Sequence, residues 1–435
     1  MPILRPLRAL RYGRDHSSFL DELISPAVRG EPSDRTIVGD VHPWNVRQLV
    51  RGDRGPLAQE DDPPFTHASR LLGSWKQDGI VARDARPALY VYEQRFGEQF
   101  RRGVVGLVRL DPEGSPRLLP HEFSRGGSAE TLAAQLAATR CQFSLVMAIS
   151  PDRRGILADY LDRHPGRNDI EVHDGKGHQN RIWRDEDPAH HVELNDALRD
   201  EHAVIADGHH RVEAAMKYQA ACAGGQPVTR ERPYDYVMTL LVPASQPGLI
   251  SRPTHRVCEA LGTGGRAFLD DLDQRFSITS LERDALPQWF EEPGIRFALA
   301  RKGGIVGLEL RPDAPSVRQA LATLPGALAS VEPAVLSATV LDPLALAEIG
   351  DAWNGDGADT GGAASNSSFS HNRTSATEVI DSALAGTVDA AFLLRPVPND
   401  QVLAVAEEGL LMPAKSTNFY PKPIKGLLMN SLVSF

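Results

Sequence analysis

The string Ala-Asp-Gly-His-His-Arg at residues 206–211 holds the densest set of side chains that could do chemistry. An apolar run, Ala203–Ile205, precedes it and an Ala-rich helical pattern begins at Arg211, which predicts a strand, an Asp-Gly junction and a helix. Glycine lets a ligand approach the backbone, and the free N–H groups of a helix N-terminus favour an anion. Two histidines and an arginine add charge and donors, so the string indicates a phosphate site. An ordinary Asp-Gly turn before a solvated helix start is the alternative.

Each residue of this string has a predicted role in such a site. Gly208, His209, His210 and Arg211 would hold the phosphates of a ligand. Asp207 is the residue type that holds Mg²⁺ beside phosphates, and it is the predicted metal ligand.

A second candidate is Glu122, which follows His121 and lies just after a predicted strand. A carboxylate in this setting can serve as a general base, with the neighbouring imidazole close to the substrate. A salt-bridged sheet edge would show the same residue types, so both interpretations stay open.

A third candidate is Arg256, in the string Pro253-Thr254-His255-Arg256. Its guanidinium group could bind a phosphate or a carboxylate, because the fork of N–H donors matches either anion. A solvated turn that caps a helix is the alternative.

The fourth candidate is the string Met-Pro-Ala-Lys-Ser-Thr-Asn-Phe-Tyr-Pro-Lys at residues 412–422. Its lysines, hydroxyls and amide suit an anionic ligand, and Lys415, Ser416 and Thr417 are predicted to bind substrate. Prolines near both ends restrict the shape of the loop. The glycine-rich stretch of a Walker A loop is missing. A structural clasp between the C-terminus and the main body is the alternative.

Composition restricts the class of protein. The chain has 435 residues and a formal net charge of −10, which argues against general affinity for nucleic acid, since nucleic-acid binding needs a basic face. No apolar run reaches the length of a membrane span, and no signal peptide is evident, so we expect a cytoplasmic protein without a membrane partner. The three cysteines, far apart, predict neither a disulfide framework nor a zinc site. No GxGxxG or GxSxG string occurs.

Hydrophobic periodicity predicts an α+β (mixed α/β) protein, because strands and helices alternate without a strict βαβ rhythm. We expect one region at 1–260 and a C-terminal α/β region at 261–435. The stretch 355–368 lacks large apolar residues and is expected to be a mobile loop. Residues 150–200 contain few apolar runs, so we expect loops, short strands and one helix near Pro188–Arg199.

These strings together resemble a bacterial and archaeal family known as domain of unknown function 1015. The resemblance extends from end to end of the chain. It is carried by the following strings: Arg5-Pro6-Leu7-Arg8-Ala9-Leu10-Arg11-Tyr12, His42-Pro43-Trp44-Asn45-Val46, Pro87-Ala88-Leu89-Tyr90-Val91-Tyr92-Glu93-Gln94, Leu119-Pro120-His121-Glu122, Ala206-Asp207-Gly208-His209-His210-Arg211, Tyr234-Asp235-Tyr236-Val237-Met238 and Met412 to Lys422.

That family resembles the ParB/sulfiredoxin superfamily, in which a Gly-x-(His/Arg)-Arg element at a helix N-terminus holds nucleotide phosphates. The resemblance implies a ParB/sulfiredoxin-like nucleotide-binding core, additional α/β elements at the C-terminus, and the 412–422 string packing back on the core. The Asp-Gly-His-His-Arg version is similar to that of kinases that make O-phospho-L-serine from free L-serine and ATP or ADP. Those enzymes use a glutamate to activate the hydroxyl and an acid to hold Mg²⁺. Asp207 matches the acid by motif, whereas Glu122 is assigned the role of the glutamate by its chemistry and not by alignment. The predicted catalytic residues are Glu122, Asp207 and His210.

One departure from the family concerns a Pro-Pro-Tyr-Asp string near the N-terminus, where this chain has Ser25-Pro26-Ala27-Val28. If the missing tyrosine and aspartate shape the substrate pocket, the acceptor differs or activity is lost. Three alternatives to a serine kinase therefore stay open: a nucleotide-dependent switch without turnover, a ParB-type DNA-binding module, which the acidic charge disfavours, and a kinase for another hydroxylated metabolite.

Overall fold

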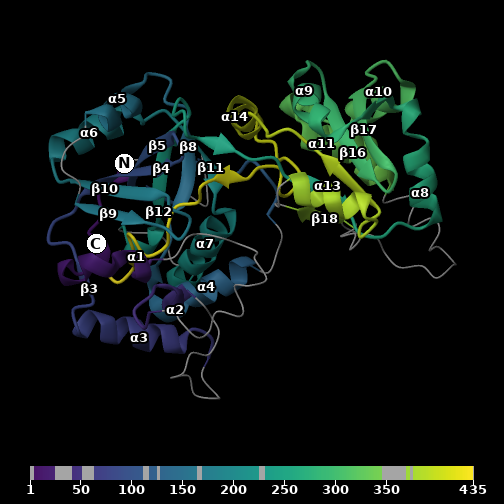
Figure 1. Cartoon of the computed structure of the whole chain (residues 1–435). Coiled ribbons are helices and arrows are strands. Elements are labelled where there is room, and N and C mark those ends of the chain that lie inside the picture. Colours follow the sequence, from purple (N-terminus) through teal and green to yellow (C-terminus); the bar gives the residue numbers. More distant parts are fainter. Residues whose placement is uncertain are drawn as a thin grey trace. The chain divides into compact units, whose positions relative to one another are not determined.

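The computed structural model describes residues 4–24, 42–50, 63–110, 117–124, 128–163, 169–224, 231–344, 369–372 and 376–434. These residues form two compact units (Figure 1). The first unit comprises residues up to 120, 124–250 and 419–435, and the second comprises 121–123 and 251–418. The boundary between the units lies after Ile250, and β14 (His255–Cys258) belongs to the sheet of the second unit.

A mixed sheet forms the centre of the first unit. In the described part of the chain it has nine strands, in the order β6-β11-β8-β12-β5-β4-β10-β9, with β1 paired to β5. Strand β12 runs parallel to β8 and β11 runs parallel to β6, whereas the remaining pairs are antiparallel. The strands are β1 (Leu4–Arg5), β4 (Leu89–Phe96), β5 (Gln99–Arg109), β6 (Leu118–Leu119), β8 (Val146–Ser150), β9 (Ile170–His173), β10 (Gln179–Asp185), β11 (Ala203–Asp207) and β12 (Tyr236–Pro243).

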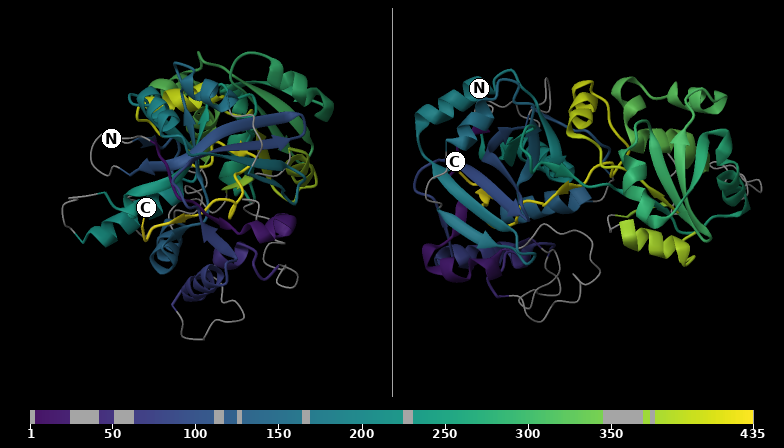
Figure 2. Two further views of the ribbon diagram at one scale, coloured as in Figure 1. Left: turned by 90° about the vertical axis from the view of Figure 1, so that its left-hand side faces the viewer. Right: turned by 45° about the horizontal axis from the view of Figure 1, so that its top comes forward.

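Helices cover both faces of this sheet. Helices α5 and α6 lie on one side, and α4 and α7 lie on the other (Figures 1 and 2). Burial of apolar side chains such as Leu161, Leu194 and Val212 against the strands provides the main stabilisation. The helices of this unit are α1 (Leu20–Leu23), α2 (Arg47–Val50), α3 (Thr66–Gln77), α4 (Ser128–Thr139), α5 (Ile156–Asp162), α6 (Pro188–Ala197) and α7 (His209–Ala223).

The C-terminal segment is part of the first unit. Strand β21 (Asn430–Ser431) pairs with β7 (Cys141–Gln142), and the backbone of Met429 exchanges hydrogen bonds with that of Leu10. Strand β2 (Leu10–Tyr12) in turn pairs with β3 (Val81–Arg83). The 412–422 string is therefore divided between the units, since residues from Phe419 onward belong to the first.

The second unit has a six-stranded antiparallel sheet among the residues described, in the order β15-β17-β16-β19-β14-β18. Alternate residues of its strands face two separate cores. Phe297 and Leu299 pack with α8, α10 and α11, whereas Ala298 and Ala300 pack with α9 and α13. The strands are β14 (His255–Cys258), β15 (Phe276–Leu281), β16 (Arg296–Arg301), β17 (Gly304–Leu310), β18 (Phe369–Asn372) and β19 (Ala390–Leu393). The helices are α8 (Thr263–Asp270), α9 (Leu286–Glu291), α10 (Pro315–Leu321), α11 (Glu332–Leu336), α13 (Ala376–Leu384) and α14 (Asn399–Glu407).

The structure confirms the predicted mixed α/β class. The region 150–200 is more regular than the sequence suggested, because it contains α5 and the strand β10 of the central sheet. Strand β10 has the polar sequence Gln-Asn-Arg-Ile-Trp-Arg-Asp, and its Asn180 and Asp185 are buried with hydrogen-bond partners. Apolar periodicity therefore could not reveal it. The loop predicted at 355–368 lies outside the described residues.

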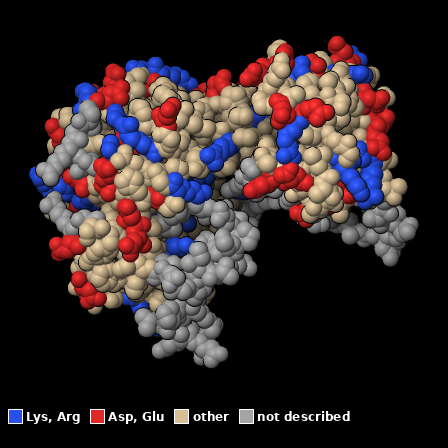
Figure 3. Space-filling model, in the orientation of Figure 1, with Lys and Arg blue, Asp and Glu red and all other residues tan. Residues whose placement is uncertain are grey.

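The surface charge concerns the prediction about nucleic acid, and the length and polarity of the helices concern the prediction about a membrane. On the face shown in Figure 3, basic and acidic side chains are interspersed and do not form one continuous basic field. No helix in the described ranges is both long enough and apolar enough to cross a membrane.

Candidate functional site

The predicted strand–glycine–helix junction is present. Strand β11 ends at Asp207, Gly208 adopts φ 108° and ψ 25°, and α7 begins at His209. A φ of this value is strained for any residue with a side chain. A Cβ atom at Gly208 would also lie 2.8 Å from Nε of Arg211. The junction therefore requires glycine, and the fifteen-residue helix α7 begins directly after it.

Two cations bind the Asp207 carboxylate at this junction. The ammonium group of Lys422 lies 2.7 Å from Oδ1, and the guanidinium group of Arg211 pairs with Oδ2. Arg211 also donates a hydrogen bond to the carbonyl oxygen of Leu145, so its position is restrained from two sides. Asp207 therefore holds Arg211 and Lys422 next to the N-terminus of α7.

The contacts of Asp207 with Arg211 and Lys422 affect its predicted role as a magnesium ligand. Mg²⁺ prefers oxygen ligands at about 2.0–2.1 Å and tolerates little distortion. Each oxygen of Asp207 contacts a cation, so an ion bound there would share these oxygens with Arg211 and Lys422. Within the described ranges, no group of three histidine, cysteine or acidic residues could hold a metal ion. The metal-binding role of Asp207 stays a prediction.

Arg101, on β5, adds a buried positive charge near this junction. Its side chain is 1% exposed, and its guanidinium group donates to the Gln94 side chain and to the carbonyl oxygens of Tyr420 and Pro421. These acceptors are neutral, and among the described residues no carboxylate lies within ion-pair distance of Arg101. Burial lowers the pKa of Arg101 to about 10, and attraction to Tyr92 and Asp207 opposes that decrease.

Three cations gather near the junction. Arg211 and Lys422 pair with Asp207, and Asp207 also attracts Arg101. Cations near a helix N-terminus suit a phosphate-bearing anion. The sequence analysis did not single out Arg101, and it included Lys422 only as one of the lysines of the 412–422 string. The charge of that string was the available signal for Lys422. No sequence pattern pointed to Arg101.

The two histidines lie in the first turn of α7. His210 is 8% exposed, and its Nδ1 lies 3.9 Å from a carboxylate oxygen of Glu213 on the same helix. His209 is half-buried. Both residues therefore occupy the positions that the sequence analysis assigned to them, directly after Gly208.

A hydrogen-bonded chain of three side chains was not predicted from the sequence. The hydroxyl group of Tyr420 lies 2.9 Å from Nε2 of His178, and Nδ1 of His178 lies 2.8 Å from an Asp174 carboxylate oxygen. An imidazole between a carboxylate and a phenol can pass a proton. The chain also holds the C-terminal segment near Lys422.

A second group of predicted residues lies in the second unit. One carboxylate oxygen of Glu122 accepts hydrogen bonds from the backbone N–H groups of Ser416 (2.9 Å) and Thr417 (3.3 Å). His121 Nε2 lies 2.8 Å from the Thr417 hydroxyl oxygen. The structure therefore brings together four of the predicted residues, His121, Glu122, Ser416 and Thr417, and all four are buried.

The other two predicted residues of the second unit differ in setting. Arg256 lies on β14 with 1% of its surface exposed, and it donates a hydrogen bond to the carbonyl oxygen of Thr254. This burial excludes the solvated turn that was the alternative for Arg256. Lys415 is half-buried and has a positive φ of 61°. In the second unit, hydrogen bonds thus join His121, Glu122, Ser416 and Thr417 into one group.

Comparisons with known proteins give one family and several solved structures. The model of a protein family of unknown function, DUF1015, matches residues 4–327. Free serine kinase in complex with AMP is 10% identical over 74% of this chain and 90% of its own, with a TM-score of 0.36. A conserved hypothetical protein from Pyrococcus furiosus is 11% identical over 76% and 97% of the two chains, with a TM-score of 0.37.

A third structure and one further search complete the comparison. C-terminally truncated SbnI from Staphylococcus aureus is 11% identical over 73% of this chain and 84% of its own, with a TM-score of 0.34. No curated protein matches the chain.

Proposed function

The chain belongs to the DUF1015 family, and from this premise we propose that it is a nucleotide-binding small-molecule kinase. It would transfer a phosphoryl group from ATP or ADP to the hydroxyl group of a small acceptor. Free L-serine is the first acceptor to test, because the Asp-Gly-His-His-Arg string resembles that of free serine kinases. The observation that carries the proposal is the gathering of Arg101, Arg211 and Lys422 near the start of the glycine-initiated helix α7.

Phosphoryl transfer depends mainly on position and charge. The reacting groups must be held in line, and negative charge on the phosphoryl oxygens must be neutralised. The N–H groups after Gly208 would bind phosphate oxygens, and Arg211 and Lys422 would neutralise their charge. Asp207 would keep both cations in place before the nucleotide arrives. Loss of one such contact commonly reduces the rate on the order of 10²–10³.

Glu122 is the proposed general base that accepts the proton of the acceptor hydroxyl. A carboxylate can accept a proton, which supports this role. The backbone N–H groups of Ser416 and Thr417 donate hydrogen bonds to one oxygen of this carboxylate only. The other oxygen accepts no hydrogen bond from the residues that the structure describes. His121, Lys415, Ser416 and Thr417, together with Arg256, are the proposed substrate-binding residues.

The test is a direct assay of phosphoryl transfer. The full chain is incubated with L-serine, Mg²⁺ and either ATP or ADP, and O-phosphoserine is detected by mass spectrometry. Asp207→Ala is assayed in parallel, with Asp196→Ala as the control, since Asp196 is an exposed carboxylate in a surface ion pair. We expect product from the wild type and from the control, and none from Asp207→Ala.

Two other outcomes would change the assignment. Nucleotide binding without any O-phosphoserine would exclude serine as the acceptor, and other hydroxylated metabolites would then be screened. Nucleotide binding without turnover of any acceptor would favour a nucleotide-dependent switch. The sequence observation that favours this second candidate is the substitution at Ser25–Val28, which lies outside the described residues.

A further inference from the structure

A cavity of about 220 Å³ lies in the first unit, at a place that the proposed kinase reaction does not use. Three arginines line it: Arg5, Arg8 and Arg83. Its remaining walls are partly apolar, with three prolines and two leucines, and partly formed by the C-terminal residues Asn430, Ser431 and Ser434. The cavity therefore combines positive charge with an apolar surface.

The cavity is separate from the junction at Gly208. Strand β5 contributes Leu107 to the cavity wall, and Arg101 lies six residues earlier on the same strand. A strand rises about 3.4 Å per residue, so roughly 20 Å separate these two positions. A ligand in the cavity would therefore not be the phosphate that Arg101 and α7 attract.

Two of the three arginines have no carboxylate partner among the described residues. Arg5 pairs with Glu231 at 2.5 Å. Arg8 donates one hydrogen bond, to the backbone carbonyl oxygen of Asp84. Arg83 donates to the backbone carbonyl oxygen of Arg8 and to the hydroxyl and carbonyl groups of Ser434. Arginine offers five N–H donors, so Arg8 in particular has donors to spare.

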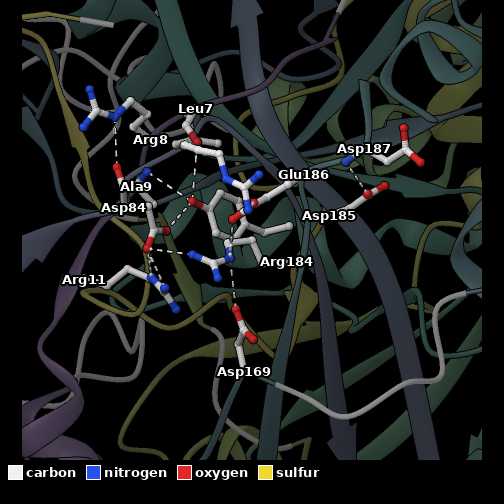
Figure 4. Close-up of polar contacts among 12 residues, drawn as sticks. Leu7, Arg8, Ala9, Arg11, Asp84, Asp169, Arg184, Asp185, Glu186 and Asp187 are labelled. Atoms are coloured by element: carbon white, nitrogen blue, oxygen red, sulfur yellow. Dashed lines mark hydrogen bonds and ion pairs between the residues drawn. The ribbon is translucent and has the colours of Figure 1, made fainter. Parts of the chain in front are cut away.

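The nearest buried carboxylate does not neutralise these arginines. The Asp84 side chain pairs with Arg11 and Arg184 (Figure 4), and it accepts a hydrogen bond from the hydroxyl group of Tyr90. Figure 4 also shows Arg184 extending to a second carboxylate, that of Asp169, at 3.3 Å. Arg184 also pairs with Glu186, which in turn pairs with Arg86, so the carboxylates of this network have arginine partners other than Arg8 and Arg83.

The electrostatic surroundings of Arg83 agree with an excess of positive charge. Burial lowers the pKa of the Arg83 guanidinium group, and repulsion from Arg8 lowers it further. Two neighbouring cations without a carboxylate between them repel each other, and an anion bound between them would remove that repulsion.

We propose that this cavity binds a small organic anion. Its carboxylate or phosphate group would contact Arg8 and Arg83, and its apolar part would lie against the prolines and Leu107. The volume of about 220 Å³ is below the usual range for drug-sized ligands. The ligand class is therefore an acid or phosphate ester about the size of an amino acid.

The experiment uses the full chain and three probes. Isobutyrate tests a carboxylate, its neutral analogue isobutyramide tests the need for charge, and inorganic phosphate distinguishes a phosphate site from a carboxylate site. Binding is measured by isothermal titration calorimetry, and a crystal structure of the wild type with the bound probe locates it. We expect isobutyrate or phosphate to bind in contact with Arg8, and isobutyramide to bind at least about tenfold more weakly.

Two arginine variants then test whether Arg8 binds the anion. Arg8→Gln should weaken binding of the anion about tenfold or more, whereas Arg86→Gln, on an exposed side chain close in sequence, should leave it unchanged. Nucleotide affinity should be the same in both variants, which separates this proposal from the proposed kinase function. Equal binding of isobutyramide, a probe located elsewhere in the crystal, or no binding of any anion to the wild type would overturn the proposal.

Discussion

The ammonium group of Lys422 lies 2.7 Å from Oδ1 of Asp207, although the two residues are far apart in sequence. The contact exists because the C-terminal segment from Phe419 onward belongs to the first unit. It places a third cation beside Arg101 and Arg211 near the N-terminus of α7. The phosphate site that the sequence predicted from five consecutive residues thus depends on two other parts of the chain.

Replacement of Lys422 by glutamine should weaken nucleotide binding. A charge-assisted hydrogen bond contributes about 1.5–3 kcal/mol, so the Kd should rise on the order of tenfold to a hundredfold. Lys217→Gln is the matched control, because Lys217 lies on α7 but pairs with Glu130 and Glu213 at the surface. Calorimetric titration with ADP checks both variants. Equal affinities for the two variants would contradict a phosphate-binding role for Lys422.

Asp207→Asn distinguishes a residue that positions cations from a metal ligand. If Asp207 positions Arg211 and Lys422, kcat should fall on the order of a hundredfold while the half-saturating Mg²⁺ concentration stays unchanged. If Asp207 binds the ion, that concentration should rise strongly. We expect the first result, since both carboxylate oxygens contact cations. Steady-state rates over a Mg²⁺ series decide between the two roles.

Gly208→Ala should destabilise the protein and also remove nucleotide binding. The φ of 108° is strained for alanine, at a cost of at least about 1–2 kcal/mol, and the new Cβ would displace Arg211. Gly224→Ala, at the other end of α7, is the control: it has φ 57° and no atom within 4 Å of the new Cβ. Urea unfolding should show a loss of stability in both variants. Only Gly208→Ala should lose affinity for ADP, and retained affinity would mean that the junction does not contact nucleotide.

Glu122→Gln should reduce turnover without changing nucleotide affinity. Loss of a general base commonly reduces kcat on the order of 10²–10⁴. The glutamine oxygen can still accept the N–H groups of Ser416 and Thr417, so the loop should keep its conformation. Steady-state kinetics and ADP titration are the measurements. Wild-type turnover in this variant would leave Glu122 a structural role only.

His255 should make the second unit less stable in weak acid. Burial, with a smaller contribution from Arg256, lowers the pKa of His255 to about 4, and its Nδ1 accepts a hydrogen bond from the Leu394 N–H group. The unfolded chain takes up a proton near pH 6.5, whereas the folded chain stays neutral until about pH 4. The free energy of unfolding should therefore fall by about 2 kcal/mol between pH 7 and pH 5.

The comparison variant for this effect is His255→Gln, which cannot titrate. Urea unfolding of both proteins at pH 7 and pH 5 measures the difference between them. The variant should lose about 2 kcal/mol less than the wild type over this interval. An identical pH dependence in the two proteins would show that His255 titrates normally in the folded state.

Local patterns in the sequence predicted the elements around the phosphate site. The apolar run before Asp207, the glycine and the Ala-rich stretch after it correspond to β11, Gly208 and α7. The helix predicted near Pro188–Arg199 is α6, which begins at Pro188. These features depend on neighbouring residues, which is why a single sequence reveals them.

Contacts between distant segments were decided only by the tertiary structure. The polar strand β10 has a place in the sheet because Asn180 and Asp185 find partners on other elements, and no periodicity records that. Likewise, Arg101 and Lys422 reach the junction because β5 and the C-terminal segment converge there. The sequence alone determined which helix N-terminus is suited to an anion. Packing between distant segments determines which cations surround this helix N-terminus and which of them pair with Asp207. Those segments share no local sequence pattern.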